Sequence, residues 1–163
     1  MNYSNIKPST TSFEVKVKIA ASEILGEHII PCLVSGFKIS NPKIDFSLQI
    51  YNSSDTVRMV KEGVVDIAAV QLPKKLKHYI EKFEHLMIAE DRLVVISAVE
   101  YGIPTGRSIT VKELTKHPLV LSEEKTDLNH FVRHLFSIHR IDHRQLKVKL
   151  RLFGTSAIIT SVS

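Results

Sequence analysis

The stretch "SEILGEHIIPCLVSGFKISNP", residues 22–42, combines a helical pattern with a proline that a helix interior normally excludes. Apolar side chains recur at helical spacing, which predicts an amphipathic helix carrying Ile29, Ile30, Leu33, Val34 and Phe37 on one stripe. A proline inside a helix costs about 3 kcal/mol, because it lacks the N–H donor and its ring clashes with the preceding turn. We therefore expect residues 22–26 to form a turn and the helix to begin near Glu27 or His28, so that Pro31 falls in its first turn.

Strand and helix patterns alternate on both sides of this helix. Residues 13–22 and 43–51 alternate apolar and polar side chains, and 43–51 is typical of a strand at a sheet edge. Residues 53–63 have helical spacing with a serine at the start, and the apolar run over 64–70 is expected of a central parallel strand. This order predicts a parallel sheet with right-handed crossovers. The serine that opens the quoted stretch then lies at the carboxyl end of a strand, where open α/β sheets bind ligands.

The second half of the chain continues in the same style. Its patterns predict two strands within 83–99, joined near Glu90-Asp91, a helix over 110–117, a strand over 118–122, a helix over 126–140, a strand over 145–153 and the start of a capped helix at 155–163. The helix over 126–140 is expected to bury the face that carries Leu128, Phe131, Val132, Leu135 and Ile138.

The composition is that of a globular protein, with 44% apolar and 24% charged residues among 163. No apolar run is long enough for a membrane span, and residues 1–12 read as a flexible polar leader without signal-peptide layout. The lone Cys32 cannot form an internal disulfide, which favours a reducing cytoplasm, and its place in the helical stripe predicts that it is buried. The net charge is +5, but the basic cluster "PKKLKH" (73–78) fits a solvated loop better than a nucleic-acid patch.

The first half of the chain resembles the effector-binding domain of LysR-type transcriptional regulators. The matching features are the small-residue strand end, the Ile30-Pro31 pair, Phe37 followed by Asn41-Pro42, and then Asn52-Ser53, Gly63 and Asp66. None of these motifs is specific alone, and it is their ungapped order over about fifty residues that carries the resemblance. Weaker similarity continues through "LMIAEDRLVVISA", "VKELTKHPLVLSE" and "LRLFGTSAIITSVS".

The resemblance implies an α/β, type-2 periplasmic-binding-protein-like fold, with two Rossmann-like subdomains around a ligand-binding cleft. The implied division is an incomplete subdomain I over 13–89, a subdomain II over 90–154, and a crossover back to subdomain I that starts at 155–163. The chain departs from the family pattern because it has no DNA-binding domain, and because the C-terminal part of the first subdomain is missing. These departures suggest a fragment or a truncation, and an exposed apolar edge, a swapped segment or disorder near the C-terminus.

Ser22 and Ser53 each precede a predicted helix and admit two readings. As N-caps they would stabilise the helices by about 1 kcal/mol each. As ligand contacts they would stand beside free backbone N–H groups and positive dipole ends, which suit a carboxylate or another small anion.

Metal binding and catalysis find little support in the sequence. His130 and His134 are one helical turn apart, with His139 and His143 beyond them, but the first pair lies opposite the apolar face and is expected in solvent. There is no phosphate loop or nucleophile elbow, and paired acids such as Glu123-Glu124 fall in loops. We expect no cofactor and no enzymatic activity.

The sequence thus predicts the ligand-sensing domain of a LysR-type regulator that binds a small polar or anionic metabolite. The alternative is a free-standing solute-binding protein or a small enzyme on the same fold. The predicted ligand contacts are short polar side chains at strand or helix ends, namely Ser22, Ser53, Ser54, Gln71, Ser122, Thr126 and Thr155.

The expected partners are the effector and a second copy of the chain. We predict a two-fold homodimer, or a tetramer in the full-length protein, in which the edge strand 43–51 and the helical residues Val34, Phe37 and Ile39 contribute. DNA would be contacted only through the missing N-terminal domain, and no membrane contact is expected.

Overall fold

The computed structural model describes residues 15–72, 80–103, 106 and 108–162. The predicted leader over 1–12 and the basic cluster at 73–78 lie outside the described residues. The chain divides into two compact units, Met1–Val70 and Gln71–Ser163. The predicted boundary between the family's two subdomains, after residue 89, falls later than this division and stays a prediction.

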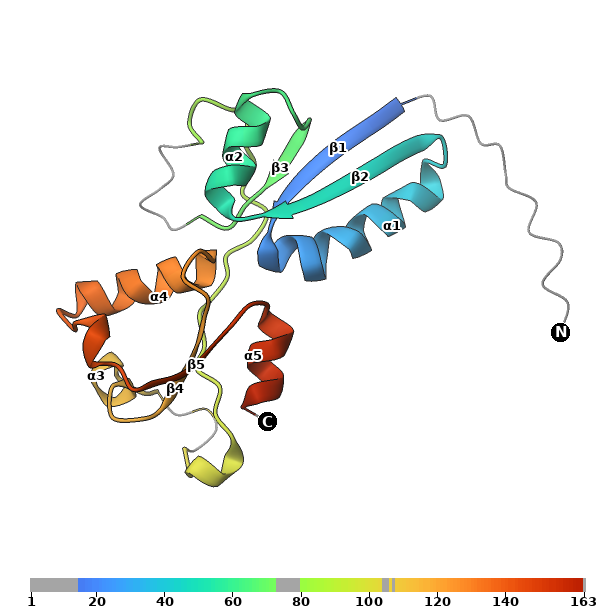
Figure 1. Ribbon diagram of the computed structural model, residues 1–163. Coiled ribbons are helices and arrows are strands. Elements are labelled where there is room, and N and C mark those ends of the chain that lie inside the picture. The colour runs from blue at the N-terminus through green and yellow to red at the C-terminus, as the bar shows by residue number, and fades with distance from the viewer. Residues whose placement is uncertain (1–14, 73–79, 104–105, 107, 163) are drawn as a thin grey trace, which may run out of the picture. The chain divides into compact units, whose positions relative to one another are not determined.

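The first unit holds a parallel sheet in the order β2-β1-β3, formed by β2 (Ile44–Tyr51), β1 (Val15–Ser22) and β3 (Ile67–Ala69) (Figure 1). The predicted edge position of 43–51 is therefore confirmed. The prediction of a central strand at 64–70 is wrong for the described sheet, because β1 pairs on both sides while β3 pairs only with β1. β1 is therefore the central strand, and its small residues Ala20 and Ala21 are fully buried, as expected of a strand that is paired along both edges.

The helix after β1 begins earlier than predicted, and Pro31 is accommodated in another way. Residues Leu25–Ile29 form a π-helical turn, in which the N–H of Ile30 donates to the carbonyl of Leu25, five residues back. The α-helix α1 (Ile30–Ser40) follows directly, with Pro31 at its start. The predicted turn over 22–26 is thus wrong, because the wider π turn shifts the hydrogen-bond pattern ahead of the proline, whose missing donor then costs little.

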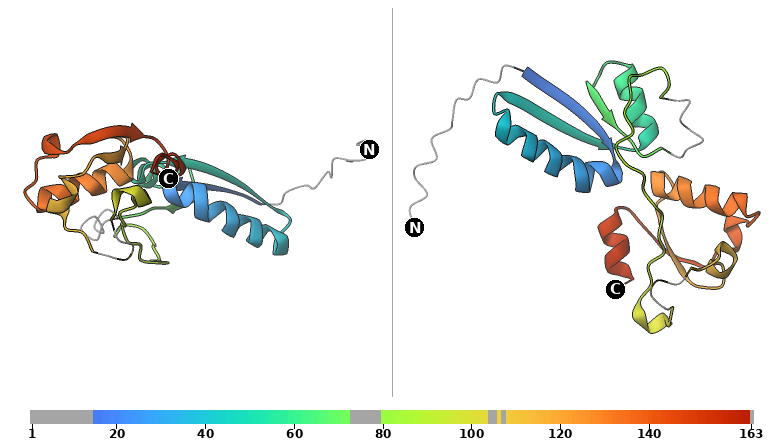
Figure 2. Two further views of the ribbon diagram at one scale, coloured as in Figure 1. Left: turned by 90° about the horizontal axis from the view of Figure 1, so that it is seen from below. Right: turned by 180° about the vertical axis from the view of Figure 1, so that it is seen from behind.

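α1 runs along β2 in both views (Figures 1 and 2) and packs one side onto the sheet. The core of this unit is Ile19, Ala21 and Ile30, with Val34, Phe46 and Leu48 packed against them. Phe37 meets Phe46 edge to face, with ring centroids 5.9 Å apart. Cys32, predicted to be buried, is exposed instead, because the core face of α1 follows Ile30 and Val34, and Cys32 lies beside that face.

The second helix, α2 (Ser53–Lys61), is capped by Asn52, whose side chain accepts a hydrogen bond from the N–H of Asp55 at 2.9 Å. The prediction that Ser53 is the N-cap is wrong, since Ser53 is the first helical residue. Gly63 ends the helix as the pattern indicates. Its φ of 69° is the left-handed conformation that glycine adopts without steric cost, and Val64 N–H closes the turn onto the carbonyl of Met59.

The second unit contains a two-stranded parallel sheet and short helices. Its elements are η3 (Val99–Tyr101), α3 (Val111–Leu114), β4 (Leu119–Ser122), α4 (Asp127–Ile138), η4 (His143–Gln145), β5 (Val148–Leu152) and α5 (Thr155–Ser161). The predicted helices and strands from 110 onward are confirmed, and Thr110 and Glu113 cap α3 reciprocally. α5 starts after Gly154 without a side-chain cap, contrary to the predicted capped start.

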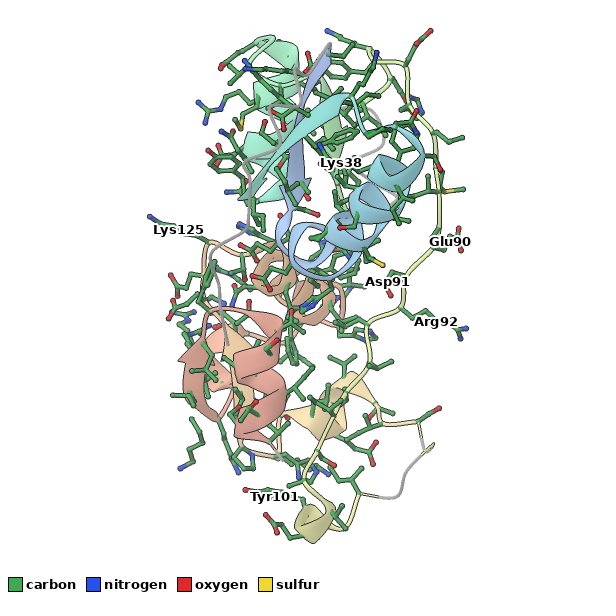
Figure 3. The ribbon with its side chains drawn as sticks, turned by 90° about the vertical axis from the view of Figure 1, so that its right-hand side faces the viewer. Lys38, Glu90, Asp91, Arg92, Tyr101 and Lys125 are labelled. Carbon is green, nitrogen blue, oxygen red and sulfur yellow. The ribbon has the colours of Figure 1, made fainter. Side chains whose placement is uncertain are left out.

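The two strands predicted within 83–99 are absent, since residues 84–98 are neither helix nor strand. Figure 3 follows this extended segment through Glu90, Asp91 and Arg92 to Tyr101. Its apolar side chains stay open to solvent; Leu86 is 84% and Val94 72% exposed. No other described segment pairs with it, and an apolar alternation forms a strand only when a neighbouring strand accepts its hydrogen bonds.

α4 buries part of the predicted face, since Leu128, Val132 and Leu135 are half-buried, together with two residues outside it. Phe136 and Asn129 are its buried residues, whereas Phe131 and Ile138 are 44% and 56% exposed. The predicted face was chosen to hold as many apolar residues as possible. It leaves out Phe136, and it leaves out Asn129 because that residue is polar.

The corrected cap of α2 gives a test of the fold. Asn52→Ala should lower the free energy of unfolding by about 1 kcal/mol, because the first turn of α2 loses its side-chain acceptor. Chemical denaturation measured by circular dichroism gives this value. The exposed neighbour Ser54 offers the matched control. If Ser54→Ala costs as much as Asn52→Ala, Asn52 is not the cap.

Candidate functional site

A cluster of buried hydroxyl groups lies at the carboxyl end of the first sheet. Ser22 is the last residue of β1, pairs with Tyr51 at the end of β2, and is fully buried. Ser53 follows Tyr51 by two residues, at the N-terminus of α2, and is 5% exposed. The parallel pairing therefore brings these two predicted site residues to one sheet edge.

Thr56, one helical turn after Ser53, adds a group that the sequence analysis missed. It is fully buried, and its Oγ1 has no hydrogen-bond partner among the described residues. An unsatisfied buried hydroxyl costs roughly 1–3 kcal/mol, so such a group is uncommon in a purely structural position. Its signal in the sequence is the spacing of three residues from Ser53, which puts both on one face of α2.

The second unit repeats this arrangement at the end of β4. Ser122 is the last residue of the strand, and Thr126 is the N-cap of α4. Both are buried, and their hydroxyl groups are hydrogen-bonded to each other. Asn129, also missed by the sequence analysis, donates from Nδ2 to the carbonyl of Ser122 at 2.8 Å. The spacing of three residues from the cap was again the available signal.

The protons of this second cluster can be assigned. Thr126 has one hydroxyl proton, which it donates to the carbonyl of Glu123 at 2.7 Å, so its Oγ1 accepts from both Ser122 and the N–H of Asn129. Because Asn129 Nδ2 faces a carbonyl, its Oδ1 points the other way, and this buried oxygen has no partner among the described residues. The cluster thus offers acceptors, the lone pairs of Ser122 and Asn129 Oδ1, and suits a ligand that donates a hydrogen bond.

The remaining predicted site residues are placed less tightly. Ser54 is exposed on the first turn of α2. Gln71 is half-buried two residues after β3 and donates to Asp91 at 3.0 Å. Thr155 is half-buried at the start of α5, three residues after Leu152, which pairs with Ser122. The role of all seven residues in ligand binding stays a prediction.

Helix N-termini stand beside both clusters. α2 and α4 each present N–H groups without helical partners and the positive end of the helix dipole. Side-chain caps already accept the N–H groups of Asp55 and Asn129. The positive dipole end of each helix favours an anionic group, whereas the acceptors of the second cluster favour a hydrogen-bond donor.

Acid–base and metal chemistry are not prominent in the described ranges. These residues contain no group of three or more histidine, cysteine or acidic side chains able to hold a metal ion. His130 and His134 are exposed, as their positions in the sequence indicate. Hydrogen bonds from Arg144 hold the pKa of Asp142 at about 2, and Asp142 in turn raises the pKa of Arg144. This exposed pair lies beyond the C-terminus of α4.

No helix in the described ranges has the length and apolar character needed to cross a membrane.

Comparison with known proteins gives consistent matches. Residues 12–163 match the family model of the LysR substrate binding domain. An uncharacterised HTH-type transcriptional regulator of Methanocaldococcus jannaschii is 29% identical over 147 residues, which cover 90% of this chain and 48% of that protein. The chain thus spans about half the length of this curated relative.

Solved structures show the same fold. The regulatory domain of Synechocystis CcmR, in complex with 2-PG, superposes with a TM-score of 0.75 at 20% sequence identity. The superposition covers 91% of this chain and 68% of the CcmR chain. The effector-binding domain of QuiR, in complex with shikimate, gives a TM-score of 0.68 at 19% identity, with 90% and 68% covered. The predicted α/β, type-2 periplasmic-binding-protein-like fold is confirmed. The parallel β2-β1-β3 sheet, the polar strand ends and the match over 12–163 lead to one assignment: the chain belongs to the family of LysR substrate binding domains.

Proposed function

We propose that this chain senses a small polar or anionic metabolite for a LysR-type transcriptional regulator. The observation that carries the proposal is the pair of buried polar clusters at the carboxyl ends of parallel strands, each beside a helix N-terminus. Ligands of open α/β sheets bind at that edge. The effector would stabilise one conformation of the domain, and a DNA-binding domain of the whole regulator would respond to this shift. A cytoplasmic location and the absence of enzymatic activity are part of the same proposal.

The chemistry of the two clusters narrows the effector class. Taken separately, the N-terminus of α2 in the first unit favours an anionic group, and the acceptors Ser122 and Asn129 Oδ1 in the second unit favour a group that donates a hydrogen bond, such as a hydroxyl. Shikimate, present in the QuiR complex, is a carboxylate that carries hydroxyl groups, which shows that this fold accommodates both. We therefore propose a hydroxylated carboxylate or a comparable small anion for this chain.

A thermal-shift screen tests the function. A metabolite at one hundred times its dissociation constant stabilises the folded state by about 2.7 kcal/mol. For a chain of this length that raises Tm by roughly 5–10 °C. We expect such shifts from hydroxylated carboxylates and none from their neutral analogues. A hit that the chain converts into a product would favour the small enzyme instead, and a hit list of apolar compounds would contradict the proposed class.

Site variants test the contacts with any effector found in this way. Ser22→Ala and Thr155→Ala should each weaken binding ten- to a hundredfold, because a hydrogen bond to a charged group contributes about 1.5–3 kcal/mol. Isothermal titration calorimetry measures the change. His130→Ala, exposed on α4, is the control and should leave binding unchanged. If the histidine variant abolishes binding and both hydroxyl variants retain it, the site has been placed wrongly.

We also propose that the chain forms a homodimer through α1. Leu33 and Ile39 on this helix are 57% and 84% exposed, whereas Val34 and Phe37, also expected at the interface, pack partly on the unit's own sheet. Burying one such side chain contributes about 1.5–3 kcal/mol to association.

Analytical ultracentrifugation at high micromolar concentration should therefore show a dimer. Ile39→Glu should raise its dissociation constant more than tenfold, because a charge would have to be buried in the contact. Lys61→Glu on the exposed end of α2 is the control and should have little effect. A wild-type chain that sediments only as a monomer would contradict the dimer.

A further inference from the structure

A basic hollow lies at the C-terminal end of α4, at the far end of the helix from the Thr126 cluster. It has a volume of about 490 Å³ and is lined by Arg133, His134, Ser137, Arg140, Ile141, Asp142 and His143. Because α4 has 12 residues, the two ends are separated by about 18 Å. The hollow is thus a separate place on the same unit.

The helix spacing explains why these side chains converge. Arg133, Ser137 and Arg140 follow one another at intervals of four and three residues, which places them on one face of the helix and its C-terminal turn. The chain then turns back through Ile141, whose N–H donates to the carbonyl of Phe136 at 3.0 Å. This turn brings His143 of η4 to the same hollow.

The charges in the hollow favour an anion. Asp142 is the acidic residue of its lining, and Arg144 holds it with hydrogen bonds of 2.7 and 2.9 Å to Oδ2, so that these two charges offset each other. Arg133 and Arg140 form no ion pair with any residue in the described ranges. The C-terminus of a helix carries a negative charge of roughly half a unit, and two guanidinium groups outweigh it. The last carbonyls of α4 also accept hydrogen bonds from N–H groups of the following turn, so they do not need the arginines as partners.

Arg140 also has a backbone conformation that glycine adopts more readily. Its φ of 56° makes it the one positive-φ residue other than glycine in the described part of the chain, at the position after a helix where glycine is preferred. The last turn of α4 contains no basic residue, so Arg140 can also compensate the helix dipole, but at an exposed position this contribution is smaller than the cost of a left-handed residue other than glycine. The side chain of Arg140 therefore points to a role that offsets its conformational cost.

We propose that this hollow binds the phosphate group of a small phosphorylated molecule. Two guanidinium groups offer forked donors that match phosphate oxygens, and the imidazoles of His134 and His143 can donate further hydrogen bonds. The hollow is open to solvent and its arginines and histidines are exposed, so a compact anion such as a phosphate group can reach them. The site acts independently of the effector contacts at Ser22 and Thr155.

The test titrates the full chain with inorganic phosphate, pyrophosphate and glycerol 3-phosphate at constant ionic strength, followed by amide chemical shifts. Saturable shifts should map to residues 133–143. Arg133→Gln and Arg140→Gly should each weaken binding at least tenfold, whereas Arg58→Gln, an arginine paired with Asp55 in the other unit, should not. Tighter binding of glycerol 3-phosphate than of inorganic phosphate identifies an organic phosphate, and the reverse identifies free phosphate.

Arg140→Gly separates binding from folding. It should raise Tm without ligand, because glycine relieves the left-handed conformation, while it loses the anion. Equal loss of binding in Arg58→Gln, or unchanged binding in both Arg133→Gln and Arg140→Gly, would overturn the proposal. Shifts that do not saturate would show nonspecific screening and would overturn it as well.

Discussion

Parallel pairing of β1 on both sides is the constraint on which the first unit depends. All eight residues of β1 pair with β2, and three pair with β3. Parallel strands cannot be joined by a tight hairpin, so each connection must cross over, and here α1 and α2 form the crossovers. The same pairing fixes the carboxyl ends at one edge, and Ser22 therefore stands near the start of α2 regardless of the loop details.

The short β3 needs support beyond its three ladder positions. Asp66, just before the strand, accepts a hydrogen bond from the N–H of Lys18 at 2.7 Å through its carboxylate, and its own N–H donates to the carbonyl of Lys18 at 2.9 Å. A side chain thus extends the β1–β3 pairing by one residue. Hydrogen bonds with a charged acceptor contribute about twice as much as neutral ones, which suits a position where the strand is short.

The elements that the sequence predicted correctly are those whose cause is local. The helix end at Gly63, the short helix expected over 110–117 and the strand alternation over 43–51 each act through neighbours in the sequence, and each is confirmed. The strands expected within 83–99 failed because a strand depends on a partner that a local pattern cannot show. The helix start before Pro31 failed for a related reason, since a π turn depends on hydrogen bonds that span one residue more than the pattern assumes.

The same distinction applies to the candidate site. Positions at strand ends or helix starts single out Ser22, Ser53, Ser122 and Thr126. Thr56 and Asn129 had only a spacing of three residues as a signal, which is weak because a polar residue inside a helix usually faces water. The structure buries both instead, one helical turn beyond the first residue or cap of their helices. A buried amide that donates to a strand-end carbonyl holds the loop between β4 and α4 in one geometry, and the unpaired Oδ1 is the cost of that arrangement. A ligand or a bound water that donates to this oxygen would remove the cost. If the proposed effector supplied that hydrogen bond, it would stabilise this loop geometry over others, and such a difference between conformations is what a ligand-driven conformational shift requires.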